Sequence, residues 1–434
     1  MQNNIDIEEK NTNNKSGGKV IASGGFGCVF LPSLKCKGSN KREKNTVSKL
    51  MTIKNAKDEY HEIRNIKDKL KLITNYQDYY LIENYTLCKP AKLSNTDMNN
   101  FTTCSALKKK NITKKNINSS LNQLLALNMP YGGITVETFV TNNKNYNKLI
   151  EINNHLINLL KNGIITMNNK NIYHSDIKSS NILINEIPKN KSMNIRLIDW
   201  SLTVEYKPFE NNKFPDNWKN RPLQFNVPFS IILFTDLFVY KYSDFLKKKN
   251  NKKNNKEGLT NFIKNYLAMW FEERGLGHFK YINKIMYMLF YHDINVKYKL
   301  SSNEITSEND TETSQRYNNI KKYVEDKYTT PYIVNYLVEI LLHFTKFKSD
   351  GSLNLRLYLD NIFIKIIDIW GFIISYAPLY ELLFENYANL TNNQHLIIKN
   401  LKQIFIKYLY EPRIKPINIE DLERDLKEIN LFIN

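Results

Sequence analysis

The chain has 434 residues, of which 42% are hydrophobic, and it contains 22 Phe, 27 Tyr and 4 Trp. This composition excludes a disordered chain and is sufficient for two or three domains or for one large bilobal domain. The 62 Lys and Arg outnumber the 43 Asp and Glu, and the formal net charge is +19. Such a balance favours acidic partners: nucleotides, phosphoproteins, nucleic acid or an anionic membrane. Much of the charge lies in Lys/Asn runs at 108–116 and 247–258, which we interpret as solvated surface.

The cysteines give little support to a metal or redox function. They contain no Cys-x-x-Cys pair, which disfavours a zinc site and a thioredoxin-type site; they are Cys28, Cys36, Cys88 and Cys104. A secreted fold built on disulfides is not expected at this length.

No targeting or membrane segment is expected. Residues 1–16 are polar, lack the apolar stretch of a signal peptide, and are predicted to be a disordered tail. The most apolar segments are 229–240, which is short, and 361–384, which contains Lys365, Asp368 and Glu381. Neither supplies the roughly 20 clean apolar residues of a membrane span. We therefore predict a soluble intracellular protein.

Residues 17–130 are predicted to form a small strand-rich lobe. GGKVIASGGFGCVFLP indicates a strand, a glycine turn and a second strand, and NTVSKLMTI indicates a third strand. The segment 56–73 has apolar or aromatic residues spaced by three or four positions, which is typical of a helix. QLLALNMP, followed by two glycines, predicts a buried strand and a turn.

Residues 131–434 are predicted to form a large helical lobe. KLIEINNHLINLLKNGIITMNNKN is a long apolar-periodic helix, and NILI and IRLID are two short strands around a polar turn. Beyond residue 230 the pattern is helical except for polar linkers near 245–258 and 301–316.

The glycine turn is the first candidate site. Glycines between two strands let backbone N–H groups approach phosphate oxygens without interference from Cβ. The residues concerned are Ala22, Ser23, Gly24, Gly25, Phe26, Gly27 and Val29. An ordinary hairpin turn would give the same local pattern, so this stretch is weak by itself.

Lys49 is the second candidate. It alternates with Val47 and Met51 on one face of a strand, and a buried lysine there needs an anionic partner. The helix at 56–73 offers Glu62 as the expected partner, with Glu59 as its rival. A Lys–Glu pair behind a glycine turn is suited to holding phosphates, whereas an exposed strand lysine is the alternative.

The third candidate is the loop IYHSDIKSSNILI at 172–184, together with Asp199 in RLIDWSL. Asn181 and Asp199 offer the hard oxygen ligands that Mg²⁺ prefers. Asp176 is suited to orienting an attacking hydroxyl and accepting its proton, and Lys178 to neutralising charge on a phosphoryl group. His174 is expected to pack and form hydrogen bonds, because no second His or Cys lies at metal-ligand spacing.

Taken together in this order, the motifs resemble those of eukaryotic-type Ser/Thr protein kinases. SGGFGCV resembles the glycine-rich loop, although Ala22 replaces its first glycine; VSKL resembles the strand motif V-A-I-K, HSDIKSSN the catalytic loop H-R-D-L-K-x-x-N, and DWS the D-F-G motif. DIWGF at 368–372 resembles the D-x-W-G motif of a central buried helix. The composition and GCVFLPSLKC further resemble putative kinases of giant DNA viruses (mimivirus-like).

This resemblance implies an α+β bilobal fold with a β-rich N-lobe at 17–130 and a helical C-lobe at 131–434. It implies ATP and Mg²⁺ as cofactors, and a protein substrate whose Ser or Thr hydroxyl receives the γ-phosphoryl group. NMPYGG is similar to the hinge that holds adenine, with Met129 as gatekeeper and Tyr131 in the hinge. Asp368 is then expected to hold the catalytic-loop backbone. If the viral resemblance applies, the location is host cytoplasm or virion.

Several positions depart from the family pattern. Ser175 stands in place of the arginine before the catalytic Asp, and Ser201 in place of the D-F-G glycine. Phe229 stands where the A-P-E glutamate belongs, which leaves Arg413, the candidate for its usual partner, without that glutamate. Most of 235–360 is an expected helical insertion. These departures bear on substrate docking and regulation more than on phosphate chemistry.

Two other classes of function remain open at this point. A small-molecule phosphotransferase of the aminoglycoside or choline kinase type has a similar H-x-D-x-x-x-x-N loop, but Lys178 is typical of Ser/Thr protein kinases. A catalytically weak pseudokinase scaffold, or a nucleic-acid binder acting through the basic loops, would fit the +19 charge. A scaffold or a nucleic-acid binder has no physical need for the set Lys49, Asp176, Asn181 and Asp199.

Overall fold

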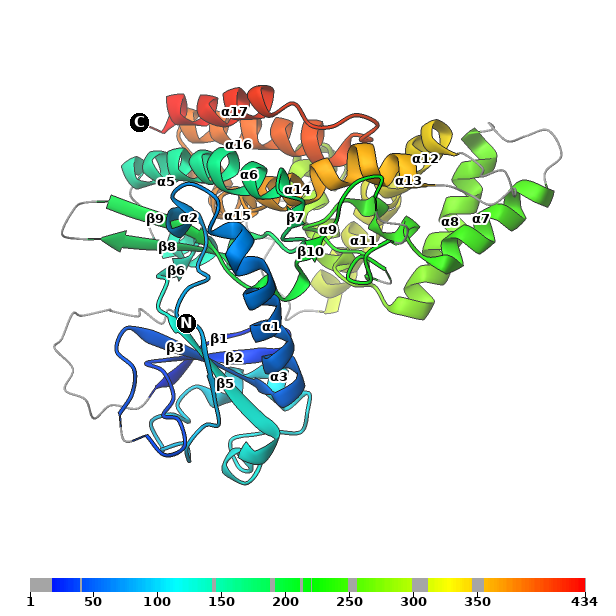
Figure 1. Cartoon of the computed structure of the whole chain (residues 1–434). Helices are drawn as coiled ribbons and strands as arrows, with labels where there is room; N and C mark the ends of the chain where they lie inside the picture. The colour runs from blue at the N-terminus through cyan, green and yellow to red at the C-terminus, as the bar shows by residue number, and fades with distance from the viewer. Residues whose placement is uncertain are drawn as a thin grey trace. The chain divides into compact units, whose positions relative to one another are not determined.

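The computed structural model describes residues 18–39, 41–142, 146–187, 192–210, 214–219, 221–248, 256–298, 311–345 and 355–433. The chain divides into two compact units (Figure 1). The first comprises Met1–Leu72 and Leu81–Gly132, and the second comprises Ile73–Tyr80 and Gly133–Asn434. This division falls close to the predicted boundary at 130, except that residues 73–80 belong to the second unit. The predicted tail at 1–16 and much of the linkers near 245–258 and 301–316 lie outside the described residues.

The first unit is built on an antiparallel sheet. Its described strands follow the order β1-β2-β3-β5-β4, with bounds β1 Lys19–Ser23, β2 Gly27–Leu31, β3 Thr46–Thr52, β4 Thr86–Cys88 and β5 Leu124–Pro130. The sheet is accompanied by α1 (Ile53–Leu70), α3 (Ser105–Lys108) and the 3₁₀ turns η1 (Phe101–Thr103), η2 (Ile117–Ser119) and η3 (Leu121–Gln123). The predicted strand, glycine turn and strand are therefore β1 and β2.

Helix α1 begins three residues earlier than its apolar spacing predicts. Thr52 is its N-cap, because its side-chain oxygen accepts a hydrogen bond from the backbone N–H of Asn55. The buried positions are spaced by three or four residues along one stripe; they are Ala56, Glu59, Ile63, Ile66 and Leu70. A carboxylate therefore lies within the buried stripe of this helix.

Two disulfides join distant segments of the first unit. Cys28 of β2 is bonded to Cys104, 76 residues further along, and Cys36 is bonded to Cys88 of β4, 52 residues further along. Cys28 and Cys104 are buried in the core of the unit. The cysteine spacing had given no reason to expect these bridges, because their partners meet only when the sheet has formed.

The second unit is mostly helical, and its short strands lie around the loop at 174–181. The strands pair as β6-β8-β9 and β10-β7, with bounds β6 Ile134–Thr135, β7 Ile172–Tyr173, β8 Ile182–Ile187, β9 Ser192–Leu197 and β10 Val204–Glu205. The predicted strands NILI and IRLID correspond to β8 and β9. In their antiparallel register, Ile182 lies opposite Leu197.

Three helical segments lie between β6 and β7, before this loop. They are α4 (Val136–Asn142), α5 (Tyr146–Asn158) and α6 (Thr166–Asn168), with a π-helical turn η4 (Leu159–Ile165) between α5 and α6. The short helix α2 (Tyr76–Tyr79) belongs to the same unit; from the adjoining Tyr80, the hydroxyl donates to the carbonyl oxygen of Gly163 at 2.8 Å. The described residues from 179 to 233 include the 3₁₀ turns η5 (Ser179–Asn181), η7 (Trp200–Leu202) and η8 (Phe229–Leu233).

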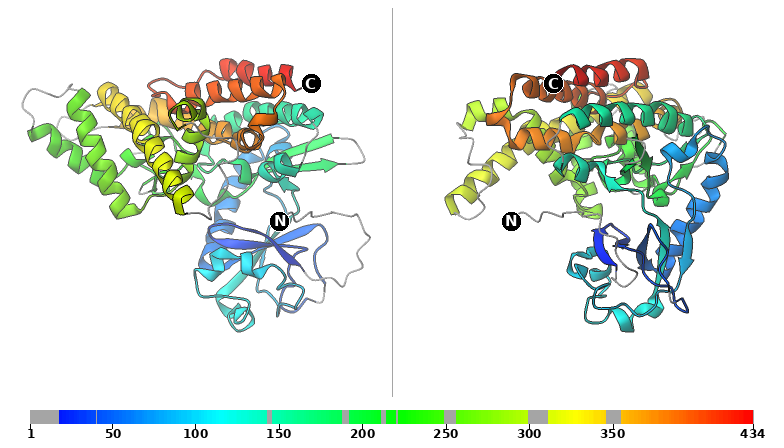
Figure 2. Two further views of the ribbon diagram at one scale, coloured as in Figure 1. Left: turned by 180° about the vertical axis from the view of Figure 1, so that it is seen from behind. Right: turned by 90° about the vertical axis from the view of Figure 1, so that its left-hand side faces the viewer.

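The expected insertion at 235–360 is mostly helical in the residues that the structure describes. It contains α7 (Asp236–Lys248), α8 (Lys256–Arg274), α9 (Phe279–Leu289), α10 (Tyr291–Tyr298), α11 (Thr311–Val324), η9 (Glu325–Thr329), α12 (Thr330–Phe344) and α13 (Arg356–Tyr358). Helices α7 and α8 lie side by side (Figures 1 and 2), and Phe238 and Tyr242 of α7 contact Phe262 of α8. Aromatic packing thus holds this pair of helices together.

The remaining helical elements include the buried central helix α14 (Ile364–Ile374). They are η10 (Leu359–Phe363), α14 (Ile364–Ile374), α15 (Ala377–Glu385), η11 (Tyr387–Asn389), α16 (Asn392–Phe405), η12 (Ile406–Tyr410), α17 (Ile419–Glu428) and η13 (Ile429–Phe432). Within the described residues, the helical run Arg356–Glu385 is long and apolar enough to cross a membrane. However, 94% of its most apolar window is buried inside the protein, which is the arrangement of a core helix in a soluble protein.

Candidate active site

The backbone of the loop after β7 is held by a buried carboxylate. Asp368 of α14 is 1% exposed, and it accepts hydrogen bonds from the backbone N–H of His174 at 2.9 Å and of Ser175 at 2.8 Å. Burial raises the pKa of Asp368 to about 7, whereas the two N–H groups and nearby Arg221 act in the opposite direction. Ser175 has a left-handed backbone with φ of 62°. The carboxylate therefore fixes a turn that the sequence alone would not favour.

His174 has a structural position in this loop. Its ring is fully buried, with Nε2 2.9 Å from the carbonyl oxygen of Ile198 and Nδ1 3.3 Å from the backbone nitrogen of Asp176, which donates to it. These contacts fix the tautomer with hydrogen on Nε2. Burial lowers the pKa of His174, so the ring is neutral. Its contact with Trp200, 4.8 Å between ring centroids, joins the loop to the DWS turn.

Asp176 lies at the centre of a set of hydrogen-bond donors. Its Oδ2 accepts from Nζ of Lys178 at 2.8 Å and from Nδ2 of Asn181 at 3.0 Å, and its Oδ1 accepts from Nδ2 of Asn226 at 2.8 Å. The side chain is 6% exposed. A carboxylate held at both oxygens has a fixed direction, which is what orienting a hydroxyl group requires.

The two predicted metal ligands lie at the same edge of the β8–β9 hairpin. Asn181 precedes β8 and Asp199 follows β9, and the backbone N–H of Ile198 donates to the carbonyl oxygen of Asn181 at 3.0 Å. Asn181 uses its Nδ2 for Asp176, which leaves its Oδ1 as the atom oriented for a cation. Asp199 has a left-handed backbone with φ of 66°, and Ser201 Oγ donates to its Oδ1 at 3.0 Å.

This pair of oxygen ligands fits a nucleotide-bound Mg²⁺ better than a metal held by protein alone. Among the described residues, no three His, Cys, Asp or Glu side chains gather to hold a metal ion. Mg²⁺ commonly takes only one or two ligands from the protein, with phosphate oxygens and water completing its octahedron. One carboxylate and one amide oxygen are therefore sufficient.

In the first unit, the glycine turn leaves open space where a Cβ would otherwise stand. Ala22 and Ser23 end β1, Gly24 to Phe26 form the exposed turn, and the backbone N–H of Gly24 donates to the carbonyl oxygen of Gly27 at 2.9 Å. A Cβ on Gly25 would meet nothing within 4 Å, whereas a Cβ on Gly27 would lie 2.6 Å from the carbonyl oxygen of Leu50. Gly24 and Gly25 thus allow close approach of a ligand, and Gly27 serves the packing of β2 on β3.

Lys49 forms an ion pair with Glu59, the rival that the sequence offered beside Glu62. Lys49 is 7% exposed, opposite Val29 of β2 and Leu127 of β5. Its Nζ lies 2.9 Å from Oε1 and 2.7 Å from Oε2 of Glu59, which is 4% exposed. The reason is the phase of α1, because Glu59 lies on its buried stripe, whereas Glu62 is only half-buried.

The predicted hinge residues end β5. Met129 is buried and lies opposite Val47 of β3. The backbone N–H of Tyr131 donates to the carbonyl oxygen of Asn45 at 2.8 Å, and burial raises the pKa of its hydroxyl. A purine near Tyr131 would therefore meet its side chain or carbonyl oxygen rather than its N–H group.

Three contacts of this loop were not predicted from the sequence. Trp218, Arg221 and Asn226 all lie in the segment after β10, and all contact Ser175 or Asp176. Their segment matches no motif, so no local pattern marks them. Further along, Phe229 is fully buried against Trp370, Tyr336 and Tyr410. An aromatic cluster therefore takes the position where the family pattern has a carboxylate.

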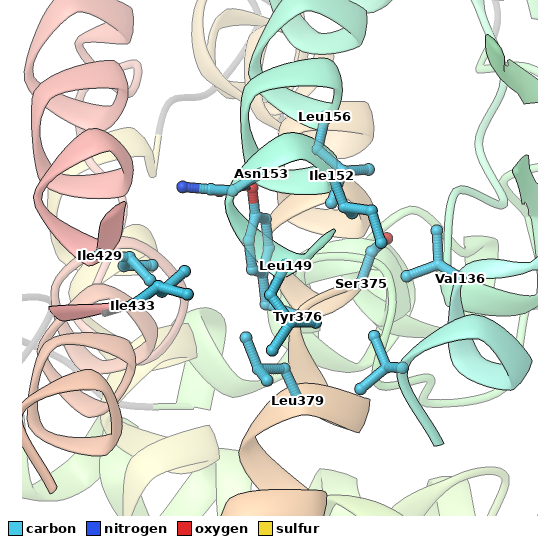
Figure 3. A pocket seen from close by; sticks show the side chains of 11 residues that line it. Val136, Leu149, Ile152, Asn153, Leu156, Ser375, Tyr376, Leu379, Ile429 and Ile433 are labelled. Atoms are coloured by element: carbon cyan, nitrogen blue, oxygen red, sulfur yellow. Dashed lines mark hydrogen bonds between the residues drawn. The ribbon is translucent and has the colours of Figure 1, made fainter. Parts of the chain in front are cut away.

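A small apolar pocket in the second unit has a different character (Figure 3). It encloses about 20 Å³, space for about one water molecule. Its lining comes mainly from α4, α5, α15 and η13 and includes no carboxylate, imidazole, ammonium or thiol among the described residues. Its buried amide, Asn153, is satisfied, since it donates to the carbonyl oxygen of Leu426 and accepts from the hydroxyl of Tyr376. The pocket offers no groups for catalysis.

Comparison with known proteins finds matches among solved structures. No protein-family model matches the chain, and no curated protein matches it. Among solved structures, a crystal structure described as a kinase domain aligns with 75% of this chain and 89% of its own, at 11% identity and a TM-score of 0.28. At this TM-score the likeness does not assign a family.

Proposed function

We propose that the chain is a Mg²⁺-dependent protein kinase that transfers the γ-phosphoryl group of ATP to Ser or Thr hydroxyls. The observation that carries the proposal is the surroundings of Asp176. A buried carboxylate fixed by an ammonium and two amides, on a loop whose backbone is held by Asp368, is an orienting group with a defined direction. Asn181 and Asp199, the two oxygen ligands suited to Mg²⁺, lie beside it on the same hairpin.

The first unit would handle the nucleotide. The open turn at Gly24 and Gly25 offers backbone N–H groups to phosphate oxygens. The buried Lys49–Glu59 pair presents an ammonium whose position is fixed, which suits it to binding the α- and β-phosphates. Met129 and Tyr131 would border the adenine.

The second unit would handle the transfer. Asp176 would orient the acceptor hydroxyl and take its proton, and Lys178 would offset negative charge on the phosphoryl group. Asn181 and Asp199 would hold Mg²⁺, which when bound neutralises charge on the phosphate oxygens. Since phosphoryl transfer depends chiefly on positioning and electrostatics, this set of residues is sufficient.

The ion pair between Lys178 and Asp176, 2.8 Å from Nζ to Oδ2, favours a protein kinase over a small-molecule phosphotransferase. A lysine two positions after the aspartate is the feature that the resemblance associates with Ser/Thr protein kinases. A purely scaffolding role would leave this set of charged groups without a purpose.

The test uses labelled ATP, Mg²⁺ and a generic protein substrate, followed by phosphoamino-acid analysis. The wild-type protein should yield phosphoserine or phosphothreonine, and Asp199→Asn should reduce turnover by about 100-fold or more, several kcal/mol of transition-state stabilisation. Asp216→Asn, the same change at an exposed position of the same segment, is the matched control and should leave turnover unchanged. Near wild-type turnover in Asp199→Asn would refute the metal assignment, and label in a small molecule alone would favour the other kinase class.

A further inference from the structure

A buried arginine contacts the loop that carries Asp176. Arg221 is 6% exposed, and its Nη1 donates to the carbonyl oxygen of Ser175 at 2.7 Å. Its Nη2 lies 3.8 Å from Oδ1 of Asp176. Its Nε and Nη2 both donate to Oε1 of Gln224, which fixes the plane of the guanidinium. These hydrogen bonds hold the guanidinium against the loop.

Asn226 contacts the same carboxylate from the same segment. It is 1% exposed, and its Nδ2 lies 2.8 Å from Oδ1 of Asp176 and 3.3 Å from the carbonyl oxygen of Ile177. Lys178 and Asn181 occupy the other oxygen, Oδ2. Asp176 is thus held at one oxygen by its own loop and at the other by a segment fifty residues away.

Ser175 is the third point of contact. Its Oγ accepts a hydrogen bond from Nε1 of Trp218 at 2.9 Å, and Trp218 is fully buried. The segment 218–226 therefore contacts the loop through an indole, a guanidinium and an amide. All three groups donate hydrogen bonds to the loop, and these three hydrogen bonds would be lost together if the segment moved.

The insertion supports the far side of this segment. The backbone N–H of His278 donates to the carbonyl oxygen of Leu223 at 2.9 Å. A Cβ on Gly277, whose φ is 54°, would lie 2.3 Å from that same oxygen. The ring of Phe225 contacts Tyr281 at 4.7 Å between centroids, and its carbonyl oxygen accepts from Nε1 of Trp370 at 2.9 Å. The segment lies against the insertion and the core helix at once.

We propose that Arg221 and Asn226 are positioning residues for Asp176, and that the segment carrying them is held in place by the insertion rather than by a modification. The proposal rests on the proposed function. The guanidinium of Arg221, from the segment itself, lies against the backbone of Ser175. The carboxylate is consequently aligned in the unmodified chain.

The test separates kcat from the KM for ATP. Asn226→Asp replaces the donor by a second carboxylate facing Asp176 at nearly unchanged volume, and it should lower kcat by about 100-fold with the KM for ATP nearly unchanged, the scale expected for a misaligned catalytic group. Asn226→Ala removes the donor without adding a charge, and it should lower kcat by about tenfold. Asn217→Asp is the matched control, because Asn217 donates only to the carbonyl oxygen of Thr203 at 3.2 Å and should leave kcat unchanged.

Arg221→Lys gives a second measurement. It keeps the charge but cannot donate at once to Gln224 and to the carbonyl oxygen of Ser175, so kcat should fall by about tenfold with the KM for ATP unchanged. If Asn226→Asp fails to fold, Asn226→Ala and Arg221→Lys decide the question. Wild-type kcat in these variants, or a loss confined to the KM for ATP, would overturn the positioning role. An inactive wild-type protein would instead overturn the proposed function, and the two failures are therefore distinguishable.

Discussion

Lys49 and Glu59 form a buried ion pair, with Nζ 2.7 Å from Oε2 and both side chains less than 10% exposed. Glu59 holds the Lys49 ammonium at both carboxylate oxygens, so losing its charge removes the group that fixes this ammonium. We therefore expect Glu59→Gln to lower kcat/KM for ATP by at least tenfold and Glu62→Gln to have a smaller effect. Lys49→Met should abolish most activity. Steady-state kinetics on the three variants checks this order, and a larger loss in Glu62→Gln would return the role to that residue.

The carboxylate of Asp368 is expected to make stability depend on pH. Its pKa in the folded protein is about 7, above its ordinary value of 3.8, because burial disfavours the charged form. Between these two values the folded chain binds a proton that the unfolded chain does not. Stability therefore decreases as pH rises through this window, with a slope of up to about 1.4 kcal/mol per pH unit from this group.

Asp368→Asn tests this expectation, because an amide does not titrate. The variant should lose the slope, and it should also be less stable above pH 7 by about 1–3 kcal/mol, since one backbone N–H of the loop loses its acceptor. Urea unfolding followed by tryptophan fluorescence suits the experiment, since all four tryptophans lie in the second unit. Equal slopes in wild type and variant would contradict the assignment.

Activity is expected to be independent of phosphorylation in the segment at 199–230. Ser175 cannot form a bidentate ion pair with a phosphate, and its hydroxyl already accepts from Trp218. Protein expressed in bacteria and treated with phosphatase should therefore transfer phosphate linearly from time zero. A lag that shortens as residues of this segment become phosphorylated would argue against the prediction.

The packing of the same segment on the insertion offers a separate prediction. Phe225→Ala removes the ring that contacts Tyr281 and His278, and we expect it to lower kcat by about tenfold through loss of alignment. Phe209→Ala is the control, because Phe209 lies in the same segment with its side chain 61% exposed. Equal kcat values in the two variants would show that this contact does not align the segment.

The two disulfides are expected to stabilise the first unit strongly. By chain entropy, closing loops of 76 and 52 residues is worth about 4–5 kcal/mol each at most. Reduction should increase hydrogen–deuterium exchange in β2 and β4 and leave β8 and β9 unchanged as an internal control. Alkylation of the native, unreduced protein followed by intact-mass measurement should show no labelled cysteine. Labelling there would contradict the bridges and favour the intracellular location predicted from the sequence.

The sequence was sufficient to predict features that depend on local pattern. The period of two in TVSKLM and the period of three to four in 56–73 predicted β3 and α1, because burying one face of a strand or helix imposes these spacings. The loop at 172–184 could be interpreted chemically because Asp176, Lys178 and Asn181 are close in sequence and therefore close in space. The resemblance of DIWGF to the family motif implied that Asp368 holds the backbone of this loop, and its carboxylate accepts from the N–H groups of His174 and Ser175.

Tertiary structure alone decided the contacts between residues distant in sequence. The ion pair between Lys49 and Glu59 depends on how α1 is rotated about its own axis against β3. The sequence does not determine that rotation to within one residue. The cysteine pairs join residues 76 and 52 positions apart, and no local propensity specifies such partners. Arg221 and Asn226 reach Asp176 only because the insertion and α14 bring their segment against the loop. Local preferences act over a few residues, whereas the alignment of the Asp176 carboxylate is fixed by burial and hydrogen bonds from elements far apart along the chain.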